Sequence, residues 1–369
     1  MCRTIMKKVR LTNYKIVIKS AINMSKVTIK NSGHTFDVRP SQTVLQAAIE
    51  AGVNLPYGCR NGACGACKAE VITGKVMHDD YQGSAMSDVE LAAGTALLCC
   101  ARPLEDLVIE CREVGGLAGI KPRILPARVA KKEQLAHDVI ALHLQLPASE
   151  RLQFKAGQYI EFILKDGKRR AFSIANAPHD SDFLQLHIRV IPGGQFSEYA
   201  ANELVEKAIL RLEAPFGSFF LREDSNKPII FVAGGTGFAP VKGMIEHMLH
   251  NNIKRDIILY RGARQLRDLY MNELSEKWAE LLPNIRYIPV LSEPDESDNW
   301  QGRTGLVHQA VLDDFEGLSG YQAYVCGAPA MCELAHQTFV QQGLESDEFF
   351  SDAFTFANPV PKLAPYKVS

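Results

Sequence analysis

Four cysteines constrain this chain more than any other feature of its sequence. Three follow the spacing C-x4-C-x2-C and the fourth comes after 31 intervening residues: they are Cys59, Cys64, Cys67 and Cys99. This spacing is typical of a [2Fe–2S] cluster, in which four thiolates hold two irons. Glycines lie among the first three, at Gly58, Gly62 and Gly65. Because glycine adopts positive φ at little cost, they suit a loop that turns backbone N–H groups toward inorganic sulfur.

A structural zinc site is the main alternative, because four cysteines also suit zinc. Zinc sites more often carry two C-x2-C pairs, and this sequence has only one, from Cys64 to Cys67. The spacing therefore favours iron–sulfur over zinc.

The composition limits the class of protein. The chain has 369 residues, a formal net charge of −1 and no run of 18 apolar residues. We expect two or three domains, no membrane span, and no nucleic acid as the main partner. Nine cysteines is an odd number, and we identify no secretory signal before them. This usage predicts a reducing compartment and a cytoplasmic location.

Both ends are expected to lie outside the folded domains. Residues 1–23 contain six Lys or Arg and no acid, a charge pattern that resembles a transit peptide. Because serine is scarce, we expect instead a disordered tail, or a start placed too early with Met24 as the true start. Residues 358–369 contain three prolines and are predicted to be irregular.

Residues 24–114 are predicted to form one module around the cysteines. The patterns predict a hairpin from 26–30 and 34–38, a helix over 43–51, and strands at 68–73 and 107–111. Short strands, one helix and a long cysteine loop resemble the β-grasp fold of plant-type ferredoxins. That resemblance places the fourth ligand three residues before Arg102, which selects Cys99. Cys100 is then expected to point the other way and pack.

Two further domains are expected after a Gly-rich linker at residues 113–122. Residues 183–190 alternate between apolar and polar side chains, and several such strands between 123 and 214 suggest an antiparallel barrel over 121–225. From 226 to 357 the pattern changes to buried strands separated by helices. It predicts a parallel sheet with helices on both faces, beginning with a strand at 229–233 and a helix from about Pro240.

The barrel contains the segment Arg170-Ala171-Phe172-Ser173. It resembles the R-x-Y/F-S motif that binds flavin in the ferredoxin–NADP reductase (FNR) superfamily. There Arg170 would pair with a flavin phosphate, Phe172 would cover the ring and Ser173 would donate near N5. The alternative is a strand with an exposed arginine and a buried phenylalanine.

A second segment, Gly193-Gly194-Gln195-Phe196-Ser197, precedes a predicted helix. Glycine amides, a hydroxyl and a helix N-terminus together suit a phosphate. The alternative is a hairpin turn with a serine N-cap. Taken with the first motif, the segment resembles half of a flavin site, and FAD is favoured over FMN by the resemblance alone.

A glycine-rich turn, Gly234-Gly235-Thr236-Gly237, follows the buried strand at 229–233 and precedes Pro240. Glycines here let the backbone approach a dinucleotide pyrophosphate at a helix N-terminus. The turn departs from a strict G-x-G-x-x-G, and the departure matches the nicotinamide domain of the same superfamily. The alternative is a turn without a ligand.

The resemblance to ferredoxin-fused, FNR-type reductases covers residues 26–355 and implies the remaining roles. A V-C-G segment puts Cys326 near the nicotinamide, and Asp352 near the C-terminus would reach the flavin. Ser173, Cys326 and Asp352 are therefore the expected catalytic residues. The other expected cofactor-binding residues are Arg170, Phe172, His187, Gly194, Gln195, Ser197, Gly234, Gly235, Thr236, Gly237, Pro240, Arg264, Gly327 and Phe354.

The implied route runs from NADH or NADPH through FAD and the [2Fe–2S] cluster to a protein acceptor, because a flavin converts electron pairs into single electrons. The chain most resembles CDP-6-deoxy-Δ3,4-glucoseen reductases, which feed a pyridoxamine-phosphate-dependent dehydrase. Reductase components of aromatic-ring oxygenases are the alternative, and a redox-sensing iron–sulfur protein is an alternative of another class. Arg261, Arg264 and Arg267 would suit NADPH, whereas the resemblance favours NADH.

Overall fold

The computed structural model describes residues 24–355, so both predicted tails, at 1–23 and 358–369, lie outside the described residues. Contacts divide the chain into one unit that ends at Lys121 and another that begins at Pro122. Between residues 24 and 355, no helix has the length and apolar character needed to cross a bilayer.

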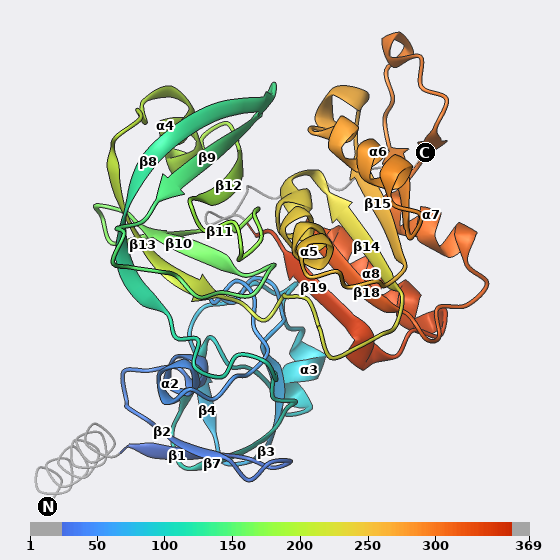
Figure 1. Ribbon diagram of the computed structural model, residues 1–369. Coiled ribbons are helices and arrows are strands. Elements are labelled where there is room, and N and C mark those ends of the chain that lie inside the picture. Colours follow the sequence, from blue (N-terminus) through green and yellow to red (C-terminus); the bar gives the residue numbers. More distant parts are fainter. Residues whose placement is uncertain (1–23, 356–369) are drawn as a thin grey trace, which may run out of the picture. The chain divides into compact units, whose positions relative to one another are not determined.

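The first unit is a mixed sheet with helix α2 packed against it (Figure 1). The strand order is β2-β1-β7-β3-β5, and β1 and β7 run parallel. This arrangement is the β-grasp fold expected from the sequence. Its elements are β1 (Ser25–Ile29), β2 (Thr35–Val38), α2 (Val44–Ala51), β3 (Lys68–Thr73), β4 (Val76–His78), α3 (Asp88–Ala92), β5 (Thr95–Leu97), β6 (Ala101–Pro103) and β7 (Leu107–Glu110).

Local sequence signals explain the first elements of this unit. The predicted hairpin is confirmed, with Val27 opposite Phe36 in the antiparallel pair β1–β2. Helix α2 begins with a capping box, in which Thr43 and Gln46 bond each other's backbone amides. It ends at Gly52, whose φ of 78° is left-handed. The short pair β4–β6 was not predicted, because strands of three residues leave no periodicity to detect.

The second unit begins with a six-stranded antiparallel sheet in the order β11-β10-β13-β8-β9-β12. A bridge between Ile174 and Leu186 joins its two edges, so the predicted barrel is confirmed. Its apolar core includes Leu142, Ile160 and Leu186. The elements are β8 (Arg123–Ala136), β9 (Val139–Gln145), β10 (Tyr159–Ile163), β11 (Arg169–Ser173), β12 (Leu184–Arg189), α4 (Gln195–Asn202) and β13 (Ile209–Phe216).

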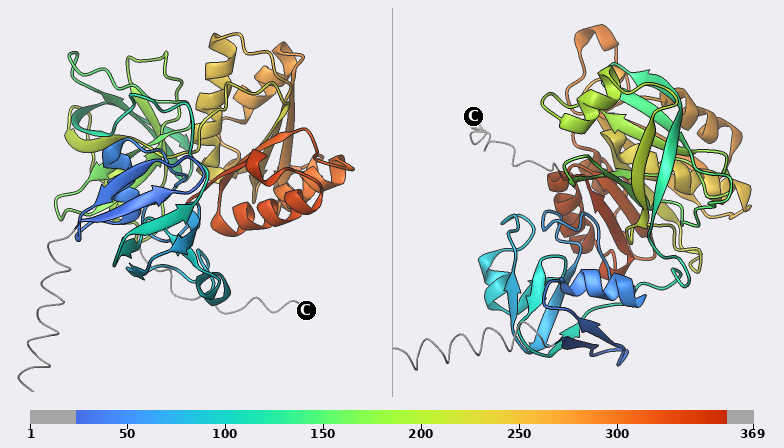
Figure 2. Two further views of the ribbon diagram at one scale, coloured as in Figure 1. Left: turned by 90° about the horizontal axis from the view of Figure 1, so that it is seen from below. Right: turned by 90° about the vertical axis from the view of Figure 1, so that its left-hand side faces the viewer.

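The rest of this unit is a parallel sheet in the order β17-β16-β15-β14-β18-β19, with helices on both faces (Figures 1 and 2). Helices α5 and α6 share one core with the sheet, and α7 and α8 share the core on the other face. The elements are β14 (Ile229–Gly234), α5 (Phe238–His250), β15 (Ile257–Ala263), α6 (Asn272–Leu281), β16 (Ile285–Leu291), β17 (Arg303–Thr304), α7 (Val307–Asp314), β18 (Gln322–Gly327), α8 (Pro329–Gln341) and β19 (Phe349–Ala353).

Two details of this sheet differ from the prediction. Pro240 does not open α5, because Gly235–Gly237 form a 3-10 turn and the helix already begins at Phe238. Residues 349–353 were not predicted as a strand, yet they form β19 at the sheet edge, paired with β18. A short segment after the last helix gives little periodicity, so only the partner strand reveals it.

Gly52 offers a test of the α2 cap. Replacing it with alanine adds a Cβ in the left-handed region and should cost about 1 kcal/mol of local stability. Hydrogen exchange of the α2 amides in the intact chain, read by mass spectrometry, would measure it. Gly83→Ala is the matched control, because Gly83 lies in the same unit with open space around it. Equal exchange in both variants would contradict the cap.

Candidate functional site

The four cysteines of the predicted cluster lie in two contacting pairs. The amide of Cys59 donates to Sγ of Cys64 at 3.4 Å, and the amide of Cys99 donates to Sγ of Cys67 at 3.5 Å. The side chains within each pair also contact each other. Two irons with two thiolates each would use this arrangement directly. The pairing fits a binuclear cluster, and no group of three or more His, Cys, Asp or Glu among the described residues is placed for a single ion.

Each pair holds one acidic thiol. The contact with Cys64 lowers the pKa of Cys59 to about 7, and contacts with Cys100 and Cys67 lower the pKa of Cys99 to about 3. The same contacts raise the pKa of Cys64 and of Cys67 well above the ordinary value. Iron binds thiolates, so metal uptake at these pairs releases the protons that their thiols hold.

Glycines shape the loop around these thiols. Gly62 and Gly65 have φ of 73° and 76°. A Cβ on Gly62 would lie 2.7 Å from Sγ of Cys100, and one on Gly65 would lie 2.9 Å from the carbonyl oxygen of Ala85. The loop thus needs glycine for its conformation and for close packing.

Cys100 does not point away as expected. Its Sγ lies 3.6 Å from Sγ of Cys99 and 3.8 Å from the carbonyl oxygen of Asp80. The turn at residues 98–100 brings both sulfurs to the same side of the chain, so backbone direction alone does not separate the two candidates. What separates them is that Cys99, and not Cys100, contacts Cys67.

Strand β11 presents two arginines with different surroundings. Arg169 pairs with Glu161 at 3.0 Å and also with Glu213. Arg170 donates to the carbonyl of Arg169 at 2.8 Å, and in the described part of the chain no carboxylate pairs with it. An arginine without a neutralising acid suits a phosphate. Arg170, and not Arg169, therefore fits a flavin phosphate.

The aromatic residue of the same motif packs inward. The ring of Phe172 lies 5.3 Å from that of Phe196 and 5.8 Å from that of Phe162. Phe172 remains half-buried, so part of its ring is left for a bound group.

The three expected catalytic residues come together at the ends of three strands. Ser173 ends β11 and donates from Oγ to Oδ2 of Asp352 at 3.4 Å. Asp352 lies on β19 directly beside Cys326 on β18. All three are buried, and burial raises the pKa of Asp352 to about 6 and that of Cys326 well above its ordinary value. A hydroxyl, a thiol and a carboxyl group that titrates near neutrality thus share one buried spot.

The predicted phosphate site at residues 193–197 is partly occupied by the chain itself. The amide of Gly193 donates to the Glu198 carboxylate at 2.8 Å, and the amide of Gly194 donates to the carbonyl of Ile191. Ser197 is not the N-cap of α4, because Gly194 is, and its hydroxyl donates to the carbonyl of Gly194 at 3.1 Å. A phosphate here would have to displace Glu198 or use other groups.

The glycine-rich turn packs against the end of β18. A Cβ on Gly237 would lie 2.1 Å from the carbonyl oxygen of Cys326, and one on Gly234 would lie 2.9 Å from Sδ of Met331. Gly327 meets the same methionine and has φ of 150°. These glycines therefore allow the turn after β14 to pack against the end of β18 and the start of α8, in addition to any approach to a nucleotide. Thr236 is half-buried within the turn, and Pro240 lies buried in the first turn of α5.

Arg261, inside β15, and Arg264, just after it, do not form one phosphate site. Arg261 is 2% exposed, and its guanidinium lies 3.7 Å from the Phe238 ring and donates to the carbonyl of Tyr270 at 2.7 Å. Because Arg261 is buried, the expectation that it could bind a 2′-phosphate is wrong. Three arginines within seven residues look alike in the sequence, so the burial of one of them could not be predicted. Arg264 is 63% exposed and 3.4 Å from Asp268, so it can reach a ligand.

The remaining predicted residues lie in the same unit. His187 is buried, with Nδ1 3.0 Å from the Tyr270 hydroxyl, and its Nε2 has no hydrogen-bond partner within the described chain. Phe354 donates its amide to the carbonyl of Gly327 at 2.8 Å. Gln195 is the first residue of α4.

Sequence reasoning missed an ion pair and a buried lysine at the contact between the barrel and the parallel sheet. Nε of Arg189 lies 3.0 Å from Oδ2 of Asp138, and a Cβ on Gly235 would lie 2.7 Å from the Arg189 guanidinium. Lys242 on α5 is 6% exposed. The polar face of residues 183–190 was the only sequence feature that pointed to this contact, and it did not identify the residues on the other side.

The buried carboxyl group makes stability depend on pH. Because the native pKa of Asp352 is about 6 against an ordinary 3.8, the native state binds the proton more tightly than the unfolded chain. Its contribution is full below about pH 4 and is lost as the pH rises through about 6, a change of about 3 kcal/mol.

Urea unfolding of wild type and Asp352→Asn from pH 4 to 7 would measure this change. The difference between the two unfolding free energies should shift against wild type as the pH rises. Asp182→Asn, at an exposed site, is the control. Parallel pH curves for wild type and Asp352→Asn would contradict the assignment.

Three protein families match this chain in series. They are described as "2Fe-2S iron-sulfur cluster binding domain" for residues 27–104, "Oxidoreductase FAD-binding domain" for residues 126–221 and "Oxidoreductase NAD-binding domain" for residues 231–337. The expected cofactors, a [2Fe–2S] cluster, FAD and a nicotinamide nucleotide, are thereby confirmed.

Similar proteins match nearly end to end. The CDP-6-deoxy-L-threo-D-glycero-4-hexulose-3-dehydrase reductase of Yersinia pestis is 39% identical over 89% of this chain and 98% of its own length. The phenol hydroxylase P5 protein of Acinetobacter pittii is 38% identical over 90% of this chain and 94% of its own length. The crystal structure of the Amycolatopsis cytochrome P450 reductase GcoB has a TM-score of 0.76 at 32% identity and covers 90% of this chain and 100% of that one. This chain belongs to the ferredoxin-fused, FNR-type reductases, NAD(P)H-dependent oxidoreductases that pass electrons through FAD and a [2Fe–2S] cluster to a partner protein.

Proposed function

We propose that the partner of this reductase is a pyridoxamine-phosphate-dependent dehydrase acting on a nucleotide-linked 6-deoxyhexulose. The observation that supports this is the 39% identity, over 98% of its length, to the dehydrase reductase of Yersinia pestis. We further infer a cytoplasmic location from the cysteine usage, because the eight described cysteines all carry free thiols. The proposed domain boundaries are 24–114, 121–225 and 226–357.

The nicotinamide nucleotide supplies a hydride, FAD accepts and holds its electron pair, and the [2Fe–2S] cluster delivers electrons one at a time. The residues of the chain bind and order them. We propose that Cys59 and Cys64 hold one iron, and that Cys67 and Cys99 hold the other. The contacts within each pair support this assignment.

We propose that Arg170 binds a flavin phosphate and that Phe172, His187, Gln195 and Ser197 line the flavin site with Gly194. The unneutralised charge of Arg170 and the unpartnered Nε2 of His187 support it. Ser173 and Asp352 then form the polar edge of the site. Below pH about 6 Asp352 is protonated, so it can hold a proton beside the Ser173 hydroxyl.

We propose that the nucleotide binds at the glycine-rich turn 234–237, with Pro240, Cys326, Gly327 and Phe354 around the nicotinamide. NADH is the favoured donor, because Arg261 is buried and committed to carbonyl groups. Arg264, 3.4 Å from Asp268, is a weak site for a 2′-phosphate, since that carboxylate already neutralises part of its charge.

A second candidate partner is the oxygenase of an aromatic-ring hydroxylating system. The 38% identity to the phenol hydroxylase P5 protein is nearly equal to that of the dehydrase reductase, and the matched lengths are similar. A sensing role is disfavoured, because the chain keeps a complete nicotinamide-binding half and a full flavin-binding half.

Reconstitution with both acceptor classes would separate the two candidates. The purified reductase is supplied with NADH and mixed either with a pyridoxamine-phosphate-dependent 3-dehydrase and its CDP-sugar under anaerobic conditions, or with an aromatic-ring oxygenase, its substrate and O2. We expect at least tenfold faster turnover with the dehydrase. Faster turnover with the oxygenase would replace the first candidate by the second. Cytochrome c reduction serves as the control that electrons leave the protein at all.

Cys99 and Cys100 form a matched pair of variants for the cluster. Cys99→Ser should lose most iron and sulfide and should slow cytochrome c reduction, because a hydroxyl is a poor iron ligand compared with a thiolate. Cys100→Ser should keep wild-type iron content. Iron and sulfide per chain, with the visible spectrum, would measure both. The reverse result would assign the fourth iron ligand to Cys100.

A further inference from the structure

The polar face of β12 forms contacts between the barrel and the parallel-sheet half of the second unit. Gln185, His187 and Arg189 alternate with the core residues of this strand and point away from the barrel. Gln185 accepts a hydrogen bond from Lys242, and His187 lies 3.0 Å from the Tyr270 hydroxyl. The guanidinium of Arg189 abuts Gly235. Each residue thus touches a different point of the nucleotide-binding half.

Lys242 makes the most extensive of these contacts. It lies on α5, and its Nζ donates to the Gln185 side chain at 3.0 Å and to the carbonyl of Ala175 at 3.3 Å. It also pairs with Glu246 at 2.8 Å. The lysine side chain is 7% exposed; the Glu246 carboxylate on the same helix neutralises its charge, and the barrel contributes two neutral oxygen acceptors.

The next residue brings the two backbones together. A Cβ on Gly243 would lie 3.0 Å from the carbonyl oxygen of Asn176 and 3.4 Å from that of Ile174. Ile174, Ala175 and Asn176 directly follow Ser173, and α5 directly follows the turn 235–237. Lys242 and Gly243 therefore fix α5 to the segment that ends the flavin motif.

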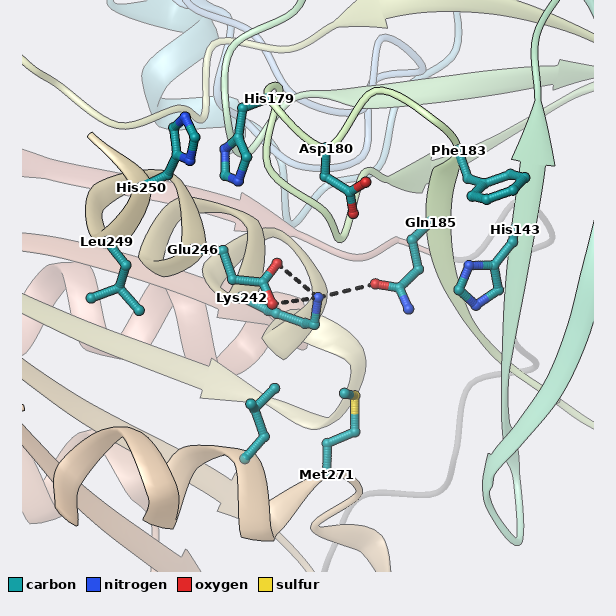
Figure 3. A pocket seen from close by; sticks show the side chains of 11 residues that line it. His143, His179, Asp180, Phe183, Gln185, Lys242, Glu246, Leu249, His250 and Met271 are labelled. Atoms are coloured by element: carbon teal, nitrogen blue, oxygen red, sulfur yellow. Dashed lines mark hydrogen bonds and ion pairs between the residues drawn. The ribbon is translucent and has the colours of Figure 1, made fainter. Parts of the chain in front are cut away.

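A cleft lies beside this contact. The cleft has a volume of about 830 Å³ and is lined by His143 and Phe183 from the barrel, by Glu246 and Leu249 from α5, and by Met271 among others. Figure 3 shows the hydrogen bond from Lys242 to Gln185 among the side chains that line the cleft. At the edge of this cleft, the polar bonds of Lys242 and the close packing of Gly243 add to the apolar core that α5 shares with the barrel.

We infer that Lys242 and Gly243 are positioning residues for hydride transfer, which set the distance between nicotinamide and flavin. The inference rests on the proposed function, in which Ser173 and the turn 234–237 serve those two groups. The established reaction moves one hydride, two electrons and a proton, from NAD(P)H to FAD. A misplacement of about 1 Å in such a step can slow it about a hundredfold.

Two variants test the inference through different physical changes. Lys242→Met removes the bonds and the charge but keeps an apolar stem, whereas Gly243→Ala keeps every bond and adds one methyl group at the backbone contact. Matched controls within the same unit are Lys254→Met and Gly317→Ala, whose sites are exposed. Alanine favours a helix over glycine, so Gly243→Ala is not expected to weaken α5 itself.

The measurements are FAD per chain, melting temperature, and anaerobic stopped-flow reduction of the flavin by NADH and by NADH deuterated at C4. We expect unchanged FAD content and a limiting rate lowered about tenfold to a hundredfold in Lys242→Met and about threefold to tenfold in Gly243→Ala. The deuterium isotope effect should rise in both variants, and the apparent Kd for NADH should change less than twofold. The controls should match wild type.

Several results would overturn the inference. Wild-type limiting rates and isotope effects per bound FAD, with only a lower melting temperature, would make both residues purely structural. Loss of FAD from Gly243→Ala would assign the contact to flavin retention and not to spacing. If wild type itself did not reduce its flavin with NADH or NADPH, the proposed function would fail first, and the variants would not be needed to show it.

Discussion

In the second unit the end of a barrel strand has to meet the carboxyl edge of the parallel sheet, and the buried hydrogen bond from Ser173 to Asp352 lies at that meeting point. It joins the last residue of a barrel strand to the edge strand of the parallel sheet. Because the carboxyl ends of parallel strands meet at one edge, β14, β18 and β19 deliver the glycine turn, Cys326 and Asp352 to the same region. The barrel then has to bring its own strand end there, and β12 and α5 hold it in place.

Much of this was predictable because the signals are local. The cysteine spacing, the alternation at 183–190 and the apolar run at 229–233 each require only a few neighbouring residues, and the corresponding elements are present. The meeting of Ser173, Cys326 and Asp352 was expected only through resemblance to a family. Ser173 lies more than 150 residues from the other two along the chain, and a local periodic pattern cannot predict a contact over that distance.

What the sequence did not reveal depends on partners distant along the chain. Arg261 reads as a surface cation, yet it is buried against Phe238 and carbonyl groups from the loop before α6. Lys242 lies 57 residues from Gln185, and neither residue type suggests the other. The glycines at 234 and 237 were interpreted as room for a nucleotide, whereas the structure shows that the chain itself already fills much of that room. A glycine-rich motif in the sequence indicates that side chains are excluded there, but it does not identify the neighbouring group that excludes them.

Both faces of strand β12 are packed against other parts of the protein, which limits how such proteins can exchange domains. Its apolar side belongs to the barrel core and its polar side to the contact with α5 and Tyr270. A slip of one residue would exchange the two sets and disrupt both. When genes of relatives recombine, the barrel and the parallel sheet should therefore be exchanged together, as one piece. The division between Lys121 and Pro122 is the natural crossover point, where a different ferredoxin module could be spliced without rebuilding that strand.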